Sequence, residues 1–99
     1  KTIVGDNLEH LTGAARVALG RADIVIFSGG LGPTEDDRTR EAAAAALGVE
    51  LRRDAQRLTA LYKRFAERRM AMPENNARQA DVIDGAEVLE NAVGSAPGQ

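Results

Sequence analysis

The chain has 99 residues, enough for a single domain, and its 13 basic and 15 acidic side chains leave a net charge of −2. That balance excludes the strongly basic surface of a general nucleic-acid-binding protein, and the absence of cysteine excludes disulfides and thiolate metal sites. Because no apolar run reaches the ~20 residues of a membrane span and no signal peptide is recognisable, we expect a cytoplasmic protein with no nucleic-acid or membrane partner.

The first part of the chain predicts a strand, a helix and a second strand. Residues 2–4 and 23–27 read as the strands, and residues 7–19 have apolar side chains at helical spacing. Asp6 and Glu9 have the spacing of a capping box, so Asp6 is the expected N-cap. The second strand is apolar at consecutive positions, which is typical of a parallel strand covered by helices on both faces. Together these elements predict a right-handed βαβ unit.

The remaining elements are mostly helical. An alanine-rich stretch predicts a helix over residues 39–47, ended by a glycine. Residues 54–68 carry a second apolar stripe, with Asp54 as the expected N-cap. Residues 74–80 predict a polar helical turn, and residues 82–89 predict a hairpin of two short strands around an Asp-Gly turn.

Both ends of the sequence look like the inside of a longer protein. Residues 2–4 read as a strand already in progress, and residues 96–99 stop in a turn-like Ala-Pro-Gly-Gln. We therefore interpret residues 1–99 as one domain that is incomplete at both ends. We expect a parent protein to complete it, within a homo-oligomer.

The most informative segment is residues 28–39, which directly follows the strand at 23–27. A strand that ends in a glycine-rich turn and leads into a helix presents backbone N–H groups to a phosphate. The Gly-Gly-Leu-Gly sequence is neither a dinucleotide fingerprint nor a P-loop, and a plain tight turn is the alternative. Its position at the carboxyl end of a buried strand favours a ligand site, because open α/β sheets bind ligands at that edge. The expected ligand contacts are Ser28, Gly29, Gly30, Leu31, Gly32 and Thr39.

Three acids follow the glycines directly, namely Glu35, Asp36 and Asp37. Carboxylates beside a phosphate cradle indicate a divalent cation such as Mg²⁺, held by Asp36 and Asp37, or an acid acting on bound substrate. Asp37 or Thr39 has a simpler alternative role as the cap of the following helix, although capping does not explain three adjacent acids. Asp6 also has capping as its alternative, but in a parallel sheet it would lie at the same edge as the glycines.

Four blocks of sequence, in order and spread over nearly the whole chain, resemble the CinA family (competence/damage-inducible protein A) in its N-terminal domain. They are residues 4–7 (Val-Gly-Asp-Asn), 28–42 (from Ser-Gly-Gly-Leu-Gly-Pro), 72–80 (Met-Pro-Glu-Asn-Asn-Ala-Arg-Gln-Ala) and 91–98 (Asn-Ala-Val-Gly-Ser-Ala-Pro-Gly). This domain is a branch of the wider molybdopterin-binding superfamily. Glu74 and Ala92 depart from the family pattern, which has prolines there.

The resemblance implies a three-layer α/β domain, with a mostly parallel sheet and helices on both faces. It implies metal-dependent hydrolysis of ADP-ribose, with Asp6 and Asp37 as the functional acids. It also places Gly94 and Ser95 in a loop that closes the pocket. Asn76, in the third block, is either a ligand contact or a solvated turn residue, since an amide can read ring edges and ribose hydroxyls.

Two other functions stay open at this point. The same glycine loop could serve a module that binds molybdopterin or another pterin phosphate without hydrolysis. It could equally serve a non-catalytic domain that binds a nucleotide to control a partner. The T-E-D-D and P-x-N-N blocks resemble CinA more than the cofactor-biosynthesis branch, so we expect the hydrolase.

Overall fold

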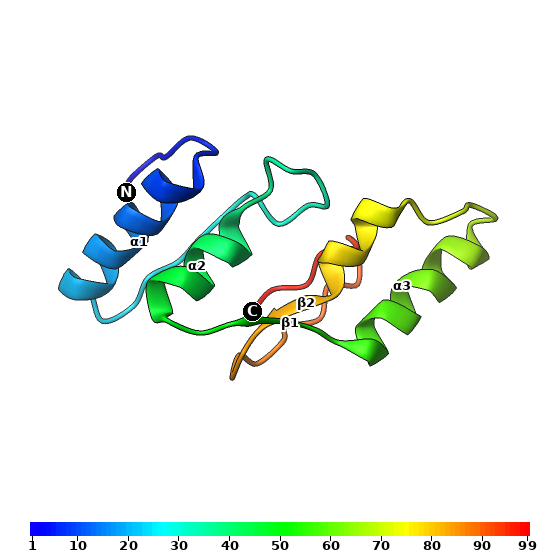
Figure 1. The fold of residues 1–99 in the computed structure, drawn as a ribbon. Coiled ribbons are helices and arrows are strands. Elements are labelled where there is room, and N and C mark those ends of the chain that lie inside the picture. Colours follow the sequence, from blue (N-terminus) through cyan, green and yellow to red (C-terminus); the bar gives the residue numbers. More distant parts are fainter.

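Three α-helices and a short two-stranded sheet form the framework of residues 1–99, all of which the computed structural model describes. In chain order the elements are α1 (Leu8–Arg21), α2 (Thr39–Leu47), β1 (Leu51–Arg53), α3 (Ala55–Glu67), the 3-10 helix η1 (Glu74–Ala80) and β2 (Asp81–Ile83). Helices α1 and α2 lie side by side at one end, α3 lies at the other, and the sheet lies between them (Figure 1). The molecule is therefore elongated, with extents of 45 × 25 × 22 Å.

The helix ends follow from local side-chain chemistry. Gly48 ends α2 in the left-handed conformation, with φ of 72°, and the Asp54 carboxylate accepts the Arg57 N–H at 2.8 Å to begin α3. Both predictions are confirmed. The predicted capping box of α1 is wrong, because Asn7 is the N-cap and its Oδ1 accepts the His10 N–H at 3.0 Å. Asp6 lies one residue earlier and forms no hydrogen bond with its side chain.

The sheet is antiparallel and joins segments that are distant in sequence. Arg53 of β1 lies directly opposite Asp81 of β2, and the two side chains form an ion pair. The predicted hairpin is therefore wrong, although Gly85 does form the expected tight turn, with φ of 82°. The segment after that turn is engaged elsewhere, because Leu89 exchanges two backbone hydrogen bonds of 2.9 Å with Gly98.

The buried core is small and made largely of alanine. Ten of the 99 residues are buried, and the six apolar ones are Ala15, Ala42, Ala43, Ala44, Leu61 and Ala80. Four of these lie where α1 contacts α2. Alanine is the best helix former, and its small side chain lets two helix axes approach closely. None of the helices combines the length and hydropathy that a membrane span requires.

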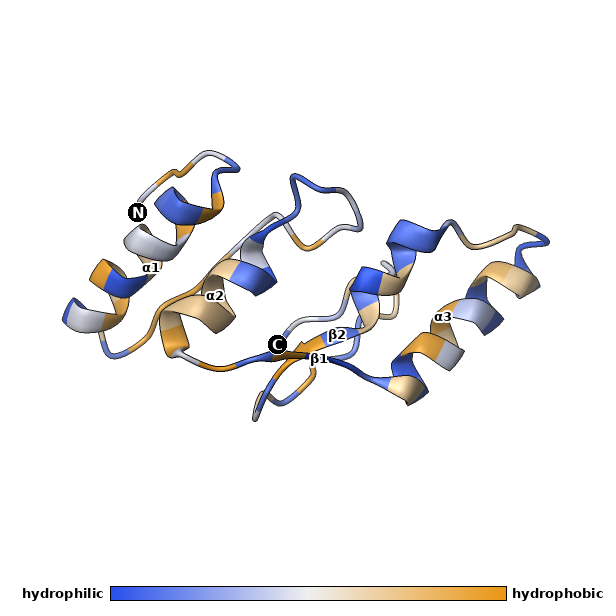
Figure 2. Cartoon of the chain, in the orientation of Figure 1, coloured by the Kyte–Doolittle hydropathy of each residue, from blue (hydrophilic) through white to orange (hydrophobic).

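The structure does not show the parallel three-layer sheet predicted from residues 2–4 and 23–27. Both segments are neither helix nor strand, because neither forms hydrogen bonds with a neighbouring strand. Figure 2 shows the strongly hydrophobic character of the segment between α1 and α2. Its residues Ile24 and Ile26 are 79% and 87% exposed. Within residues 1–99 the fold is a small α/β arrangement in which the only sheet is β1–β2.

We expect Asn7→Ala to lower the free energy of unfolding by about 1 kcal/mol, because it leaves the His10 N–H without its acceptor. The matched control is Asp6→Ala, which removes a side chain next to the same helix end but breaks no hydrogen bond. Urea titration of the two variants compares them directly. A larger loss for Asp6→Ala than for Asn7→Ala would mean that Asp6 is the cap.

Candidate functional site

The glycine loop, defined here as residues 28–37, turns back onto the first turn of α2. Gly29 and Gly30 have positive φ values of 83° and 64°, a backbone conformation that residues other than glycine rarely adopt. The Thr39 hydroxyl donates to the Gly29 carbonyl at 2.7 Å, and the Thr39 N–H donates to the Gly30 carbonyl at 3.2 Å. Thr39 is therefore not a helix cap. It ties the first half of the loop to α2.

The loop has an asymmetric hydrogen-bonding pattern. Arg40 of α2 donates to the carbonyls of Leu31 and Gly32 at 2.6 and 3.1 Å, so every carbonyl from Gly29 to Gly32 is held by α2. By contrast, the N–H groups of residues 28–31 donate no hydrogen bond within the protein. A trans peptide points its N–H away from its C=O. The held carbonyls of Gly29 and Gly30 thus turn the N–H groups of Gly30 and Leu31 away from α2, and free N–H groups of this kind are what an anion needs.

Asp37 closes the second half of the loop. Its Oδ2 accepts the Thr34 hydroxyl at 2.6 Å and the Thr34 N–H at 3.0 Å. The Thr34 hydroxyl is the main cause that holds the pKa of Asp37 below its ordinary value of 3.8; the backbone N–H groups of Thr34 and Gly32 and the charge of Arg40 act in the same direction, against desolvation. Asp37 is therefore a carboxylate at neutral pH. It does not cap α2, which begins after Arg38 without a side-chain cap.

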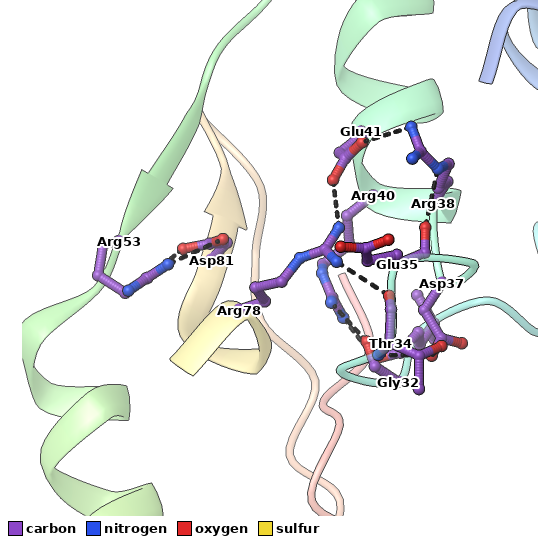
Figure 3. A network of polar contacts seen from close by, with 11 residues as sticks. Gly32, Thr34, Glu35, Asp37, Arg38, Arg40, Glu41, Arg53, Arg78 and Asp81 are labelled. Atoms are coloured by element: carbon purple, nitrogen blue, oxygen red, sulfur yellow. Dashed lines mark hydrogen bonds and ion pairs between the residues drawn. The ribbon is translucent and has the colours of Figure 1, made fainter. Parts of the chain in front are cut away.

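Three arginines, Arg38, Arg40 and Arg78, donate to backbone carbonyls of the loop (Figure 3). Arg40 is only 4% exposed, and burial lowers its pKa while the nearby Asp81 opposes this effect. Arg78 of η1 reaches across to donate to the Thr34 carbonyl at 2.9 Å and to Glu41 of α2. Arg38 donates to the Glu35 carbonyl at 2.8 Å.

The sequence pattern did not point to these arginines, although it held one signal that could have. Arg38 and Arg40 lie at the N-terminus of α2, where the helix dipole disfavours positive charge. Two cations in that position call for another partner. The structure shows that the partners are loop carbonyls.

The predicted acids do not converge into one metal centre. No group of three or more His, Cys, Asp or Glu side chains in the structure could hold a metal ion. Asp6 and Asp36 are exposed and accept no hydrogen bond. Mg²⁺ is typically held by one or two carboxylates together with substrate phosphates rather than by a protein cage. Asp37, with Asp36 next to it, fits that limited role, whereas Asp6, Asp36 and Asp37 do not form a joint site.

The predicted residues beyond the loop lie in other surroundings. Asn76 donates to Gln79 at 3.3 Å, which makes it a bonded turn residue of η1 in this structure. Gly94 and Ser95 line a small polar cavity of about 90 Å³ that includes no residue of the glycine loop. Ser28 and Thr39 line a larger cavity of about 380 Å³, whose walls are mainly apolar side chains of α1 and residues 24–27. The structure thus brings Ser28 and Thr39 to one cavity, and Gly94 and Ser95 to another.

Comparison with known proteins identifies the family to which the chain belongs. Residues 1–98 match the family model described as "Probable molybdopterin binding domain". CinA-like proteins of Koribacter versatilis and Acidobacterium capsulatum are each 61% identical over 99 residues, which is 100% of this chain and 24% of theirs. The chain thus spans about a quarter of the length of these curated relatives.

A solved structure is similar in both sequence and shape. It is the crystal structure of the protein CinA, described as having unknown function, from Thermoplasma acidophilum. It is 38% identical with a TM-score of 0.80, and the match covers 94% of this chain and 54% of that one.

We expect Thr34→Ala to raise the pKa of Asp37 toward 3.8, because it removes the hydroxyl that is the main cause of the lowered value. A lowered folded-state pKa means that the carboxylate stabilises the protein above its unfolded pKa, and that this contribution is lost as the pH falls through the folded value. A ¹³C carboxyl NMR titration measures the shift, with Thr34→Ser as the control that keeps the hydroxyl. An unchanged Asp37 pKa in Thr34→Ala would contradict this assignment.

The two positive-φ glycines should differ in their tolerance of a side chain. A Cβ at Gly30 would lie 2.3 Å from the Thr39 hydroxyl oxygen, whereas a Cβ at Gly29 would meet no atom within 4 Å. Both substitutions carry a left-handed backbone strain of about 1 kcal/mol or more. Gly30→Ala should therefore lower the melting temperature further than Gly29→Ala, because it also displaces Thr39. Differential scanning calorimetry of the pair tests this, and equal losses would contradict it.

Proposed function

The chain belongs to the family of molybdopterin-binding domains and is CinA-like, and from this premise we propose that its glycine loop binds the pyrophosphate of a nucleotide such as ADP-ribose, which the complete protein hydrolyses. The observation that carries the proposal is the run of unpaired N–H groups at residues 28–31, next to the ionised carboxylate of Asp37. The free N–H groups suit the binding of a phosphate, and the carboxylate in the same loop suits a reaction at that phosphate.

The residues divide the work between binding and chemistry. The N–H groups of residues 28–31 would hold phosphate oxygens. Asp37, with Asp36, would supply carboxylate oxygens to a divalent cation such as Mg²⁺, which offsets negative charge and activates water when bound. Asp6, whose side chain is free of hydrogen bonds in this structure, is proposed as a second acid. Gly94, Ser95 and Asn76 would contact the rest of the ligand.

The parallel sheet is part of the same proposal. In the complete protein, residues 2–4 and 23–27 would be strands of a parallel sheet, and the glycine loop would follow the second of them. The exposed side chains Ile24 and Ile26 support this, since apolar strands are normally covered. The similarity to the Thermoplasma acidophilum protein over 94% of this chain supports it too. We further propose that the complete protein is a homo-oligomer.

The test is incubation of the complete protein with ADP-ribose, with and without Mg²⁺, and detection of AMP and ribose 5-phosphate. We expect cleavage that depends on the metal. Metal-independent cleavage, or none at all, would contradict this mechanism.

Asp37→Asn should reduce turnover by at least about 100-fold, because it removes the charge from the reacting site. It should leave the melting temperature nearly unchanged, because the Asn amide oxygen can still accept the Thr34 N–H and hydroxyl. Glu35→Gln is the matched control, since it neutralises an exposed acid of the same loop whose carboxylate forms no hydrogen bond or ion pair. A large thermal destabilisation by Asp37→Asn would make Asp37 a structural residue.

Binding of a pterin phosphate without hydrolysis is the second candidate. It is favoured by the family description, which names molybdopterin binding and no reaction. Tight binding of a pterin phosphate by the complete protein, with no cleavage of ADP-ribose, would select this function over the hydrolase.

A further inference from the structure

The glycine loop is held by two separate sets of contacts. Thr39 holds the carbonyls of Gly29 and Gly30, and these peptides carry the N–H groups of Gly30 and Leu31. Arginines hold the second half of the loop, residues 31–37. Arg40 binds the Leu31 and Gly32 carbonyls, and Arg78 binds the Thr34 carbonyl.

We propose that Arg40 and Arg78 are positioning residues for the Asp37 carboxylate, which they hold at the ligand face by fixing the backbone of residues 31–34 from the opposite side. This inference rests on the proposed function, because it assigns the two arginines to the chemical step and Thr39 to phosphate binding.

The contacts of Arg40 are suited to this role. The residue is 4% exposed, so the guanidinium is largely removed from water, and its two terminal nitrogens each donate to one of the two loop carbonyls. A planar guanidinium binds two acceptors in a fixed geometry and restrains both peptide units at once. One of these peptides carries the Gly32 N–H, which acts on Asp37. Arg40 and Asp37 thus act on opposite sides of one peptide unit.

Arg78 restrains the neighbouring residue. It donates to the Thr34 carbonyl at 2.9 Å, and Thr34 in turn gives Asp37 its two hydrogen bonds. Arg78 also pairs with Glu41, so the same guanidinium links η1, α2 and the loop. Arg78 and Thr34 are 44 residues apart in the sequence. Movement of η1 would therefore displace Asp37 before it reached the N–H groups at residues 28–31.

The two sets of contacts predict different kinetic defects in the complete protein. Arg78→Met should lower kcat for ADP-ribose about 10- to 100-fold, because a displacement of ~1 Å at a reacting group has an effect of this size. Its affinity for ADP-ribose without divalent metal, measured by calorimetry, should change less than about threefold, within roughly 0.7 kcal/mol. Thr39→Val should do the reverse and weaken affinity with a smaller effect on kcat. Arg52→Met, which removes an arginine from the exposed Arg52–Asp84 pair, is the control and should match the wild type.

A second measurement does not depend on turnover. Hydrogen exchange of the Thr34 N–H, followed by NMR, should accelerate at least about tenfold in Arg78→Met, since each factor of ten reflects 1.4 kcal/mol of lost protection. Arg78→Lys, which keeps the charge and a donor group but not the planar guanidinium, should restore part of that protection. If wild-type protein does not cleave ADP-ribose, the proposed function fails, and this exchange still decides whether Arg78 positions the loop.

Two results would overturn the inference. One is an unchanged kcat together with unchanged Thr34 exchange in both Arg78→Met and Arg40→Lys. The other is an equal loss of affinity and kcat in Arg78→Met, accompanied by a fall in melting temperature, which would make the arginine a general stabiliser.

Discussion

The glycine loop depends on one constraint, the capture of its carbonyl groups by side chains and backbone of α2. Glycines at positive φ can adopt many conformations, and an isolated loop of this sequence would have no reason to face its N–H groups in one direction. Thr39 and Arg40 remove that freedom because they donate hydrogen bonds to four successive carbonyls and so fix the orientation of each one. The free N–H groups of Gly30 and Leu31 are a consequence of where the carbonyls of the same peptides are held.

That constraint requires α2 itself to be placed accurately, and its alanines do this. Ala42, Ala43 and Ala44 are buried, and the facing residues Thr12 and Ala15 of α1 are buried too. Small side chains give little apolar area, so this contact contributes less stability than a leucine core would. Its value is geometric, because close helix packing leaves few alternative positions for the first turn of α2.

Ion pairs recur in the part of the molecule beyond α2, and one of them links that part to the glycine loop's neighbourhood. Arg53 pairs with Asp81 across the sheet, and Arg78 pairs with Glu41 between η1 and α2. Exposed ion pairs contribute little, about 0–1 kcal/mol each, but these are partly buried and geometrically specific. The family match and the similarity to a solved CinA structure cover nearly the whole chain, so the loop, α2 and η1 belong to one shared arrangement.

The sequence by itself determined the local structure: the ends of α2 and α3, the helical turn at 74–80 and the tight turns at glycines. These features depend on neighbours in the chain, and their signals are short-range. The family could also be recognised from its four sequence blocks. Strand pairing could not, because β1 and β2 lie about 30 residues apart, whereas the local pattern at 82–89 predicts a hairpin that does not form.

Only the tertiary structure decided the roles of individual polar residues. Asp6 and Asn7 are both good caps in sequence, and the choice of Asn7 depended on which oxygen reaches the His10 N–H. Asp37 is a candidate cap of α2 in the sequence, and the folded loop instead places its carboxylate on Thr34. Arg40 and Arg78 could not be predicted as site residues, because their partners in the loop are backbone carbonyls, and every residue has one. A side chain that binds backbone is recognised only when both partners are located in space.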